Sequence, residues 1–184
     1  NCTVTGTADS KTINGQNAYG FAVTNNGSIT QCYVTGNIAI QGTDVAVGFV
    51  GTNSGSILNC GVYGETAYDN IIISAPKAYG FVATNNNTTG LAYAIKNVGT
   101  VTGQEEAAGF AGTSNGLITL SYANTIVSAN SSSNKKAVGF VLSSPAINGS
   151  PSVTMCYSAG SVQAYTVYGF MNTGNAEQCY TIAD

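Results

Sequence analysis

Residues 48–60 read GFVGTNSGSILNC, and this stretch decides the fold because its pattern returns along the chain. Its opening Gly-Phe pair occurs six times, with the aromatic rings at Phe21, Phe49, Phe81, Phe110, Phe140 and Phe170. Successive phenylalanines are 28, 32, 29, 30 and 30 residues apart. A fixed period of this length indicates a repeat architecture.

Other positions keep register with the phenylalanine and complete the repeat. A hydroxyl residue follows it by three positions at Thr24, Thr52, Thr84, Thr113, Ser143 and Thr173. All five cysteines fall in one further column, at Cys2, Cys32, Cys60, Cys156 and Cys179. Each unit consists of β-branched and aromatic runs broken by Asn, Gly and Ser, which is typical of strands and turns.

These units predict an all-β fold, namely a right-handed parallel β-helix of about six coils with roughly 30 residues per coil. They are shorter than propeller blades, which need about 40–45 residues. Equivalent residues of successive coils are expected to stack at the interstrand spacing of about 4.8 Å. We expect residues 1–184 to form a single solenoid domain.

The motif at residues 48–60 resembles the GLUG repeat of bacterial surface and secreted adhesin-like proteins. The copy at residues 20–33 fits that pattern well and the copy at residues 109–122 fits it fairly, whereas the other copies depart from it. Residues 87–89 and Pro145, for example, replace the Asn-x-Gly turn. The resemblance implies a β-solenoid on a cell-surface or secreted protein, and it brings no catalytic residues with it.

The composition argues against several functional classes. Only 7% of the residues are charged, and the net charge of −3 offers no basic footprint for nucleic acid. No apolar run has the length of a transmembrane helix. There is no histidine, which removes the commonest general base and metal ligand. We therefore expect no metal, cofactor or catalytic centre.

The acidic residues and the cysteines are the other groups in this sequence that could form a site. Glu105 and Glu106 are the nearest approach to a carboxylate cluster, and we expect them in a loop before Gly109, with no paired-carboxylate role. Stacked cysteines would lie within disulfide range, but parallel side chains and an odd count favour reduced thiols. None of the cysteines has zinc-site spacing.

One tyrosine column is the candidate binding surface. If Ile29 points inward, a corner or bulge near Gln31 lets Cys32 and Val34 also point inward and leaves Tyr33 outside. The same alternation predicts an external ladder of Tyr33, Tyr93, Tyr122, Tyr157 and Tyr180. Such a ladder could stack on sugars or dock a partner, or its rings could simply cover neighbouring coils.

The sequence favours a non-enzymatic structural or adhesive role for a rod or filament segment outside the cell or on its surface. The partner would be a protein or a carbohydrate, bound by surface ladders and by the variable stretches at residues 65–77 and 127–136. Both termini fall in the cysteine column, which allows head-to-tail self-association or continuation into further repeats. The alternatives are a carbohydrate-active β-helix enzyme and an ice-binding protein that uses the Thr24 column.

Overall fold

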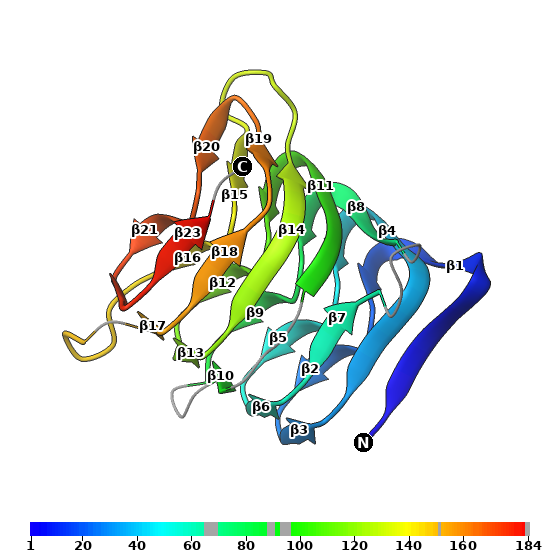
Figure 1. Cartoon of the computed structure of the whole chain (residues 1–184), viewed down its shortest axis with the longest axis horizontal. Coiled ribbons are helices and arrows are strands. Elements are labelled where there is room, and N and C mark those ends of the chain that lie inside the picture. Colours follow the sequence, from blue (N-terminus) through cyan, green and yellow to red (C-terminus); the bar gives the residue numbers. More distant parts are fainter. Residues whose placement is uncertain (65–69, 88–90, 93–96, 151, 183–184) are drawn as a thin grey trace.

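The computed structural model describes residues 1–64, 70–87, 91–92, 97–150 and 152–182. Within these ranges every regular element is a β-strand, and the named strands pair in parallel. They form a β-solenoid of about five turns with about 29 residues per turn (Figure 1). The predicted fold class is therefore confirmed. The six Gly-Phe pairs enclose five turns, because one turn runs from each pair to the next.

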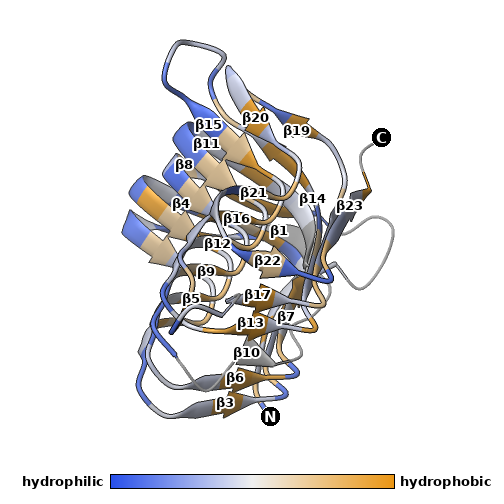
Figure 2. Ribbon diagram, turned by 90° about the vertical axis from the view of Figure 1, so that its left-hand side faces the viewer, coloured by the Kyte–Doolittle hydropathy of each residue, from blue (hydrophilic) through white to orange (hydrophobic). Residues whose placement is uncertain are grey.

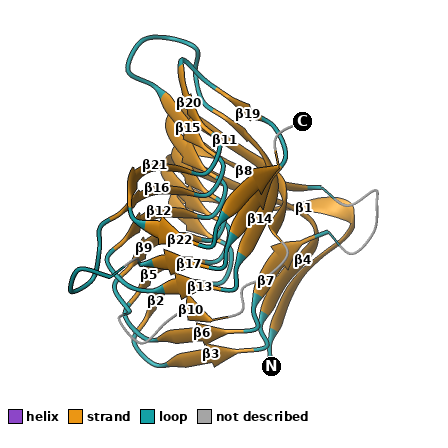
Figure 3. Cartoon of the chain, turned by 60° about the vertical axis from the view of Figure 1, so that its left-hand side comes forward, coloured by secondary structure: helices purple, strands orange, loops and turns teal. Residues whose placement is uncertain are grey.

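Each coil contributes strands to three sheets, which we call the large, second and third sheets (Figure 3). The large sheet contains β1 (Thr3–Tyr19), β4 (Tyr33–Val47), β7 (Gly61–Tyr63), β8 (Ile71–Tyr79), β11 (Asn97–Ala108), β14 (Tyr122–Ser128), β15 (Lys136–Val138), β18 (Tyr157–Ala159), β19 (Val162–Gln163), β20 (Thr166–Tyr168) and β23 (Tyr180–Ile182). The second sheet contains β2 (Ala22–Asn25), β5 (Val50–Asn53), β9 (Val82–Asn85), β12 (Ala111–Ser114), β16 (Val141–Ser144) and β21 (Met171–Gly174). The third sheet contains β3 (Ser28–Thr30), β6 (Ser56–Leu58), β10 (Leu91–Ala92), β13 (Ile118–Thr119), β17 (Val153–Thr154) and β22 (Ala176–Glu177).

The corner between the third and large sheets is the cysteine corner. The residue before Cys32, Cys60, Cys156, Cys179 and the equivalent Ser121 adopts a left-handed conformation with φ between 50° and 54°, at Gln31, Asn59, Met155, Gln178 and Leu120 respectively. This confirms the bend predicted near Gln31. The following thiol or hydroxyl then donates a hydrogen bond to the carbonyl two residues earlier, as Cys60 does to Leu58 at 3.2 Å. Ser121 makes the same bond to Thr119 at 2.9 Å.

The corner between the large and second sheets carries the Gly-Phe pair. Here the backbones of adjacent coils bond directly, with the Phe21 N–H donating to the Phe49 carbonyl at 3.0 Å. A Cβ atom on Gly48 would lie only 2.0 Å from the carbonyl oxygen of Gly80. Glycine therefore recurs at this corner because successive coils approach too closely for a side chain.

The corner between the second and third sheets is closed by a buried amide ladder. The side-chain amide of Asn25 donates to Asn53 at 2.7 Å, and that of Asn53 donates to Asn85 at 2.9 Å. The ladder ends where the Asn85 amide donates to Ser114 at 3.0 Å. It satisfies polar groups that would otherwise be buried without partners.

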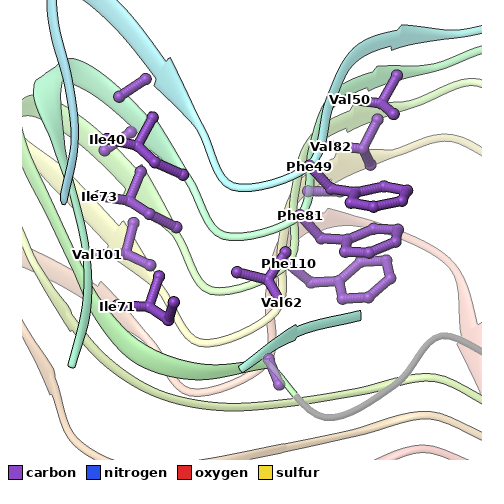
Figure 4. Close-up of a cluster of buried hydrophobic side chains, with 14 of the residues drawn as sticks. Ile40, Phe49, Val50, Val62, Ile71, Ile73, Phe81, Val82, Val101 and Phe110 are labelled. Carbon is purple, nitrogen blue, oxygen red and sulfur yellow. The ribbon is translucent and has the colours of Figure 1, made fainter. Parts of the chain in front are cut away.

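The six phenylalanines form one stacked column, as predicted. Neighbouring ring centroids are 4.7–5.0 Å apart along the whole column. The four inner rings are fully buried, and the end rings Phe21 and Phe170 are partly buried. Figure 4 shows Phe49, Phe81 and Phe110 facing Ile40 and Ile73 of the large sheet across the interior.

A second apolar cluster lies on the outside of the Gly-Phe corner. It contains Val47, Tyr79, Ala108, Val138 and Leu142, all of which are buried. The tyrosine rings occupy space that glycines leave open in the next coil. A Cβ atom on Gly112 would lie 2.7 Å from the Tyr79 ring, and one on Gly51 would lie 2.4 Å from the Tyr19 ring. The residues two places before and after the phenylalanine therefore cover one another across the corner.

Two expectations about loops are wrong. Glu105 and Glu106 lie within strand β11, and residues 71–77 of the first variable stretch belong to β8. Both segments extend the large sheet, because β8 pairs with β4 on one side and with β11 on the other. The part of that stretch at residues 65–69 lies outside the described residues. The second variable stretch does form a connection, between the end of β14 and the start of β15. In Figure 2 the hydrophilic segments of β8, β11 and β15 directly precede their apolar ends at the Gly-Phe corner.

Candidate functional site

The cysteine corner places a tyrosine at the start of several large-sheet strands. Because the thiol or hydroxyl of the preceding residue points inward to cap the corner, the tyrosine side chain points outward. Tyr122, Tyr157 and Tyr180 occupy this position on β14, β18 and β23, and their backbones pair in register. The ladder position thus follows from the corner.

These three rings form a continuous stack on the outer face of the large sheet. The centroids of Tyr122 and Tyr157 are 4.9 Å apart, and those of Tyr157 and Tyr180 are 5.2 Å apart. The ring planes are nearly parallel, at 1° and 8°. Tyr180 is the most open member, with 56% of its surface exposed. We call Tyr122, Tyr157 and Tyr180 the tyrosine stack.

Tyr33, another predicted member, does not join this stack. Tyr33 contacts Tyr63 in an edge-to-face arrangement at 5.9 Å, and its in-register neighbour on β7 is Gly61. Tyr93 lies outside the described residues. The predicted five-ring ladder is therefore divided by the glycine, and Tyr63, which was not part of the predicted column, partners Tyr33.

An apolar rim beside the tyrosine stack was not anticipated from the sequence. Leu120 and Met155 occupy the left-handed corner position, yet they are 40% and 47% exposed. Ile182 is 52% exposed two residues after Tyr180. The signal was present in the sequence, because the corresponding corner residues of earlier coils are Gln31 and Asn59. Bulky apolar residues are unusual in this conformation and at an exposed corner.

Burial and neighbouring phenols raise the pKa of two hydroxyls in the tyrosine stack. Partial burial, followed by the neighbouring phenol of Tyr157, raises the pKa of Tyr122 above its ordinary value. Burial and Tyr180 act in the same way to raise the pKa of Tyr157. A protonated phenol can both donate and accept a hydrogen bond. Tyr122 and Tyr157 therefore each present a hydroxyl that can act in both ways.

The geometry limits what the tyrosine stack can bind. Inner ring faces are used by neighbouring rings, so a ligand meets ring edges and hydroxyl groups along the stack. The outward face of Tyr180 is the best-exposed flat aromatic surface of the three. Leu120 and Met155 add apolar contact area beside it. This combination suits a partner with mixed apolar and hydroxyl chemistry.

The acidic pair has a structural partner. The hydroxyl of Tyr79 donates a short hydrogen bond to the carboxylate of Glu106. Burial, and then the nearby carboxylates, raise the pKa of Tyr79 above its ordinary value. Glu105 lies beside Asp44 and Lys77 at a separate shallow depression of the same sheet. Glu106 thus secures the outer apolar cluster.

The cysteine column consists of free thiols, and Cys2 is its exposed member. Burial raises the pKa of Cys156 to about 12, which keeps that thiol protonated as a hydrogen-bond donor. Among the residues that the structure describes, no group of three or more potential metal ligands comes together. In the same described ranges, no helix has the length and apolar character needed to cross a bilayer.

Comparison with known proteins gives no further assignment. No protein-family model matches the sequence. No curated protein matches it either. No solved structure is similar to the chain.

Proposed function

We propose that this chain is a non-enzymatic structural and adhesive repeat segment of a secreted or cell-surface protein. The observation that carries the proposal is the tyrosine stack with its apolar rim of Leu120, Met155 and Ile182. Exposed aromatic and apolar side chains on a rigid scaffold are typical of interaction surfaces. The parallel solenoid holds them in register, so little ordering entropy opposes binding.

The repeat organisation also supports this proposal. The inward positions of the described coils build one continuous hydrophobic core, which the phenylalanine column, the amide ladder and the cysteine corner hold in register. The resemblance to GLUG repeats points in the same direction. We infer that the partner is an extracellular protein or carbohydrate that contacts the tyrosine stack and the 129–135 connection.

Head-to-tail self-association is a further form of partner contact that we propose. In the isolated chain, Phe21 and Phe170 each stack on one neighbour only, and the strand edges of the end coils are unpaired. Another coil placed there would continue all three sheets. That coil could belong to a second copy or to more of the same polypeptide.

The test is a binding screen of the immobilised chain against extracellular-matrix proteins and glycans. We expect binding to at least one ligand and a loss of more than about tenfold in Tyr157→Ala, which breaks the stack at its centre. Tyr165→Ala is the matched control, because Tyr165 is exposed but lies outside the tyrosine stack. Absence of binding across the screen, or glycan hydrolysis by the purified chain, would contradict the proposal.

Ice binding is the second candidate, and one observation favours it. Five threonines and Ser143 form an unbroken row across the second sheet, one hydroxyl per coil in register: Thr24, Thr52, Thr84, Thr113, Ser143 and Thr173. The adjacent outward column is mixed, with Gly51, Ala83 and Leu142 among its members. An ice-recrystallisation assay distinguishes the two functions, because adhesion predicts no inhibition and no effect of Thr84→Val.

A further inference from the structure

Two β-bulges lie at the same height of the large sheet, in alternate coils. Between matched positions, β4 has one more residue than β1 and β8, and β11 has one more residue than β8. The inserted segments are Thr43–Asp44 in β4 and Gln104–Glu105 in β11. Bulges redirect side chains at sheet surfaces and often border functional sites.

A groove crosses the strands on one side of these bulges. It consists of two adjoining depressions of about 390 and 280 Å³, which share Gln41 and Gly42. The inserted Thr43 and Gln104 form its rim on the bulge side. The groove therefore runs along the solenoid axis, from β1 to β11.

The bulge in β4 also accounts for the glycine in the floor of the groove. A Cβ atom on Gly42 would lie 2.0 Å from the carbonyl oxygen of Val45, so the bulge closes only over glycine. In the groove, Gly42 lies between Gly15 of β1 and Ala75 of β8. The Ala75 side chain is buried in the core, so the floor offers mainly backbone, which a flat ring can approach.

The second wall is a row of uncharged polar side chains in register. Asn14, Gln41, Ser74 and Thr102 pair in sequence across β1, β4, β8 and β11. Within the described chain, the amides of Asn14, Gln41 and Gln104 make no hydrogen bond, so they are available to a ligand. Amides and hydroxyls offer both donors and acceptors.

Charged groups are separated from the groove by the bulges. Asp44, Lys77 and Glu105 line a different depression, beyond the inserted residues. Asp44 is held there by Gln16, whose side-chain amide donates to its carboxylate at 2.7 Å. The groove lining itself contains no ionisable side chain. A charged ligand would therefore meet no complementary charge in the groove.

We propose that this groove binds a neutral, extended polysaccharide along the solenoid axis. Sugar hydroxyls would exchange hydrogen bonds with one polar side chain per coil, and the apolar ring faces would lie over Gly15, Gly42 and Ala75. An extended β-1,4-linked hexopyranose chain advances per sugar by nearly the interstrand spacing of about 4.8 Å that separates successive coils. The inference rests on the proposed adhesive function and names its ligand class and a binding site apart from the tyrosine stack.

Affinity gel electrophoresis with soluble neutral polysaccharides, a β-1,4-glucan and a β-1,3-glucan, tests the inference, with alginate as the anionic comparison. We expect retardation by a neutral glucan and roughly a tenfold weakening in the Gln41→Ala/Thr102→Ala double variant, from the loss of two or more hydrogen bonds. Gln163→Ala is the matched control, because Gln163 is an exposed member of the same row beyond the groove. Circular dichroism and thermal unfolding confirm that each variant is folded.

The remaining outcomes separate this inference from the proposed function. Weakening in Gln41→Ala/Thr102→Ala together with normal binding by Tyr157→Ala supports the groove. Weakening only in Tyr157→Ala overturns the groove and leaves the adhesive function intact. Stronger retardation by alginate, or binding only to protein ligands, also overturns the neutral-glycan inference alone. Failure to bind any glycan or protein overturns both.

Discussion

The N-terminal half of the solenoid, residues 1–108, and the C-terminal half, residues 109–182, share one backbone design but fill it differently. Opposite the Gly-Phe corner, the N-terminal half places isoleucines, with the Cδ1 atom of Ile40 against Gly20 and that of Ile73 against Gly48. The C-terminal half places hydroxyl residues there, with Thr125 facing Gly109 and Ser158 facing Gly139. Different register positions of the large sheet therefore face this corner in the two halves, because Val127, and not Thr125, aligns with Ile40 and Ile73.

The corner between the second and third sheets shows the same difference. Its buried residues are Asn25, Asn53 and Asn85 in the N-terminal half. In the C-terminal half they are serines, and Ser144 pairs with Ser152 at 2.8 Å. An asparagine links two coils through its long amide, whereas a serine bonds over a shorter reach.

The comparison teaches that the corners set the fold, while the filling sets local stability. Each buried hydroxyl must find a partner, because an unsatisfied polar group is costly to bury. The Ser158 hydroxyl has such a partner, because it donates a hydrogen bond to the Gly169 carbonyl at 2.7 Å. The Thr125 hydroxyl makes no hydrogen bond in the described structure, and this residue is only 2% exposed. We therefore expect the C-terminal half to be the less stable one.

The largest expected effect comes from breaking the element that both halves share. Phe110 lies between Phe81 and Phe140 at the boundary, at centroid distances of 5.0 and 4.7 Å. Phe110→Ala should lower the free energy of unfolding by about 3–5 kcal/mol, because it leaves a cavity in the fully buried column. Urea unfolding measures this loss.

Phe170→Ala is the control for position in the column. Phe170 stacks on Phe140 alone and is partly exposed, so its removal should have a smaller effect than that of Phe110. Equal losses in the two variants would show that burial in the column does not determine stability. A loss below about 1 kcal/mol in Phe110→Ala would contradict the central role of the column.

Most of the architecture could be predicted from the sequence, because the repeat makes register visible. The Phe column and the bend at Gln31 followed from spacing and alternation alone. Glu105 and Glu106 are adjacent acidic residues shortly before Gly109, and the sequence alone predicts a loop there. Their strand position depends on pairing with β8, and single-chain patterns do not show such pairing.

The candidate site was only partly predictable. Alternation placed the tyrosines outside, but whether two rings stack depends on which residue occupies the adjacent coil. Gly61 next to Tyr33 prevents a stack there, whereas Tyr157 next to Tyr122 permits one. The groove was not foreseen, because bulges arise from a one-residue difference between neighbouring strands. Insertions that change coil length hide such differences in a sequence alignment of repeats.

Removing one amide from the N-terminal ladder gives the next largest effect. Asn53 is fully buried, accepts a hydrogen bond from Asn25 and donates one to Asn85. Asn53→Ala should destabilise the protein by about 2–3 kcal/mol through the loss of both bonds. Asn53→Ser imitates the C-terminal half and should lose less. Thr52→Ala, one residue away and half-buried, should change denaturant stability little, and a similar loss there would argue against the ladder.

A smaller effect of opposite sign is expected in the C-terminal half. Thr125→Val replaces the unpartnered hydroxyl with a methyl group of similar size, which should raise the free energy of unfolding by about 1–2 kcal/mol. Ser158→Ala is the matched change at a satisfied hydroxyl, and it should destabilise the protein. Thermal and urea unfolding report both. Destabilisation by Thr125→Val would show that this hydroxyl has a partner.

The smallest expected effect concerns the one corner where the two halves use the same chemistry. Cys60 in the N-terminal half and Cys156 in the C-terminal half both donate to the carbonyl two residues earlier, and Ser121 shows that a serine serves equally. Cys156→Ser should therefore be nearly neutral at pH 7. Burial raises the pKa of Cys156 from 9.0 to about 12 in the folded protein. Serine does not titrate in this range.

The sign of the pH effect follows from this shift. The folded state favours the protonated thiol, so the stabilisation is fully present below pH 9.0 and is lost as the pH rises toward about 12. At about pH 10 the unfolded thiol is mostly ionised and the folded one is not, which corresponds to a loss of roughly 1 kcal/mol in the wild-type protein. The Cys156→Ser variant should not show this loss of unfolding free energy at about pH 10, because it has no thiol to ionise at this position. Cys60 and Tyr79 also have raised pKa values, but they are present in both proteins and lie away from Cys156, so their contributions cancel in the comparison. Urea unfolding of both proteins at about pH 8 and about pH 10 measures the difference. If both proteins lose the same stability, the Cys156 thiol is ionised as easily in the folded corner as in the unfolded chain, and the buried hydrogen-bond donor proposed for this corner is incorrect.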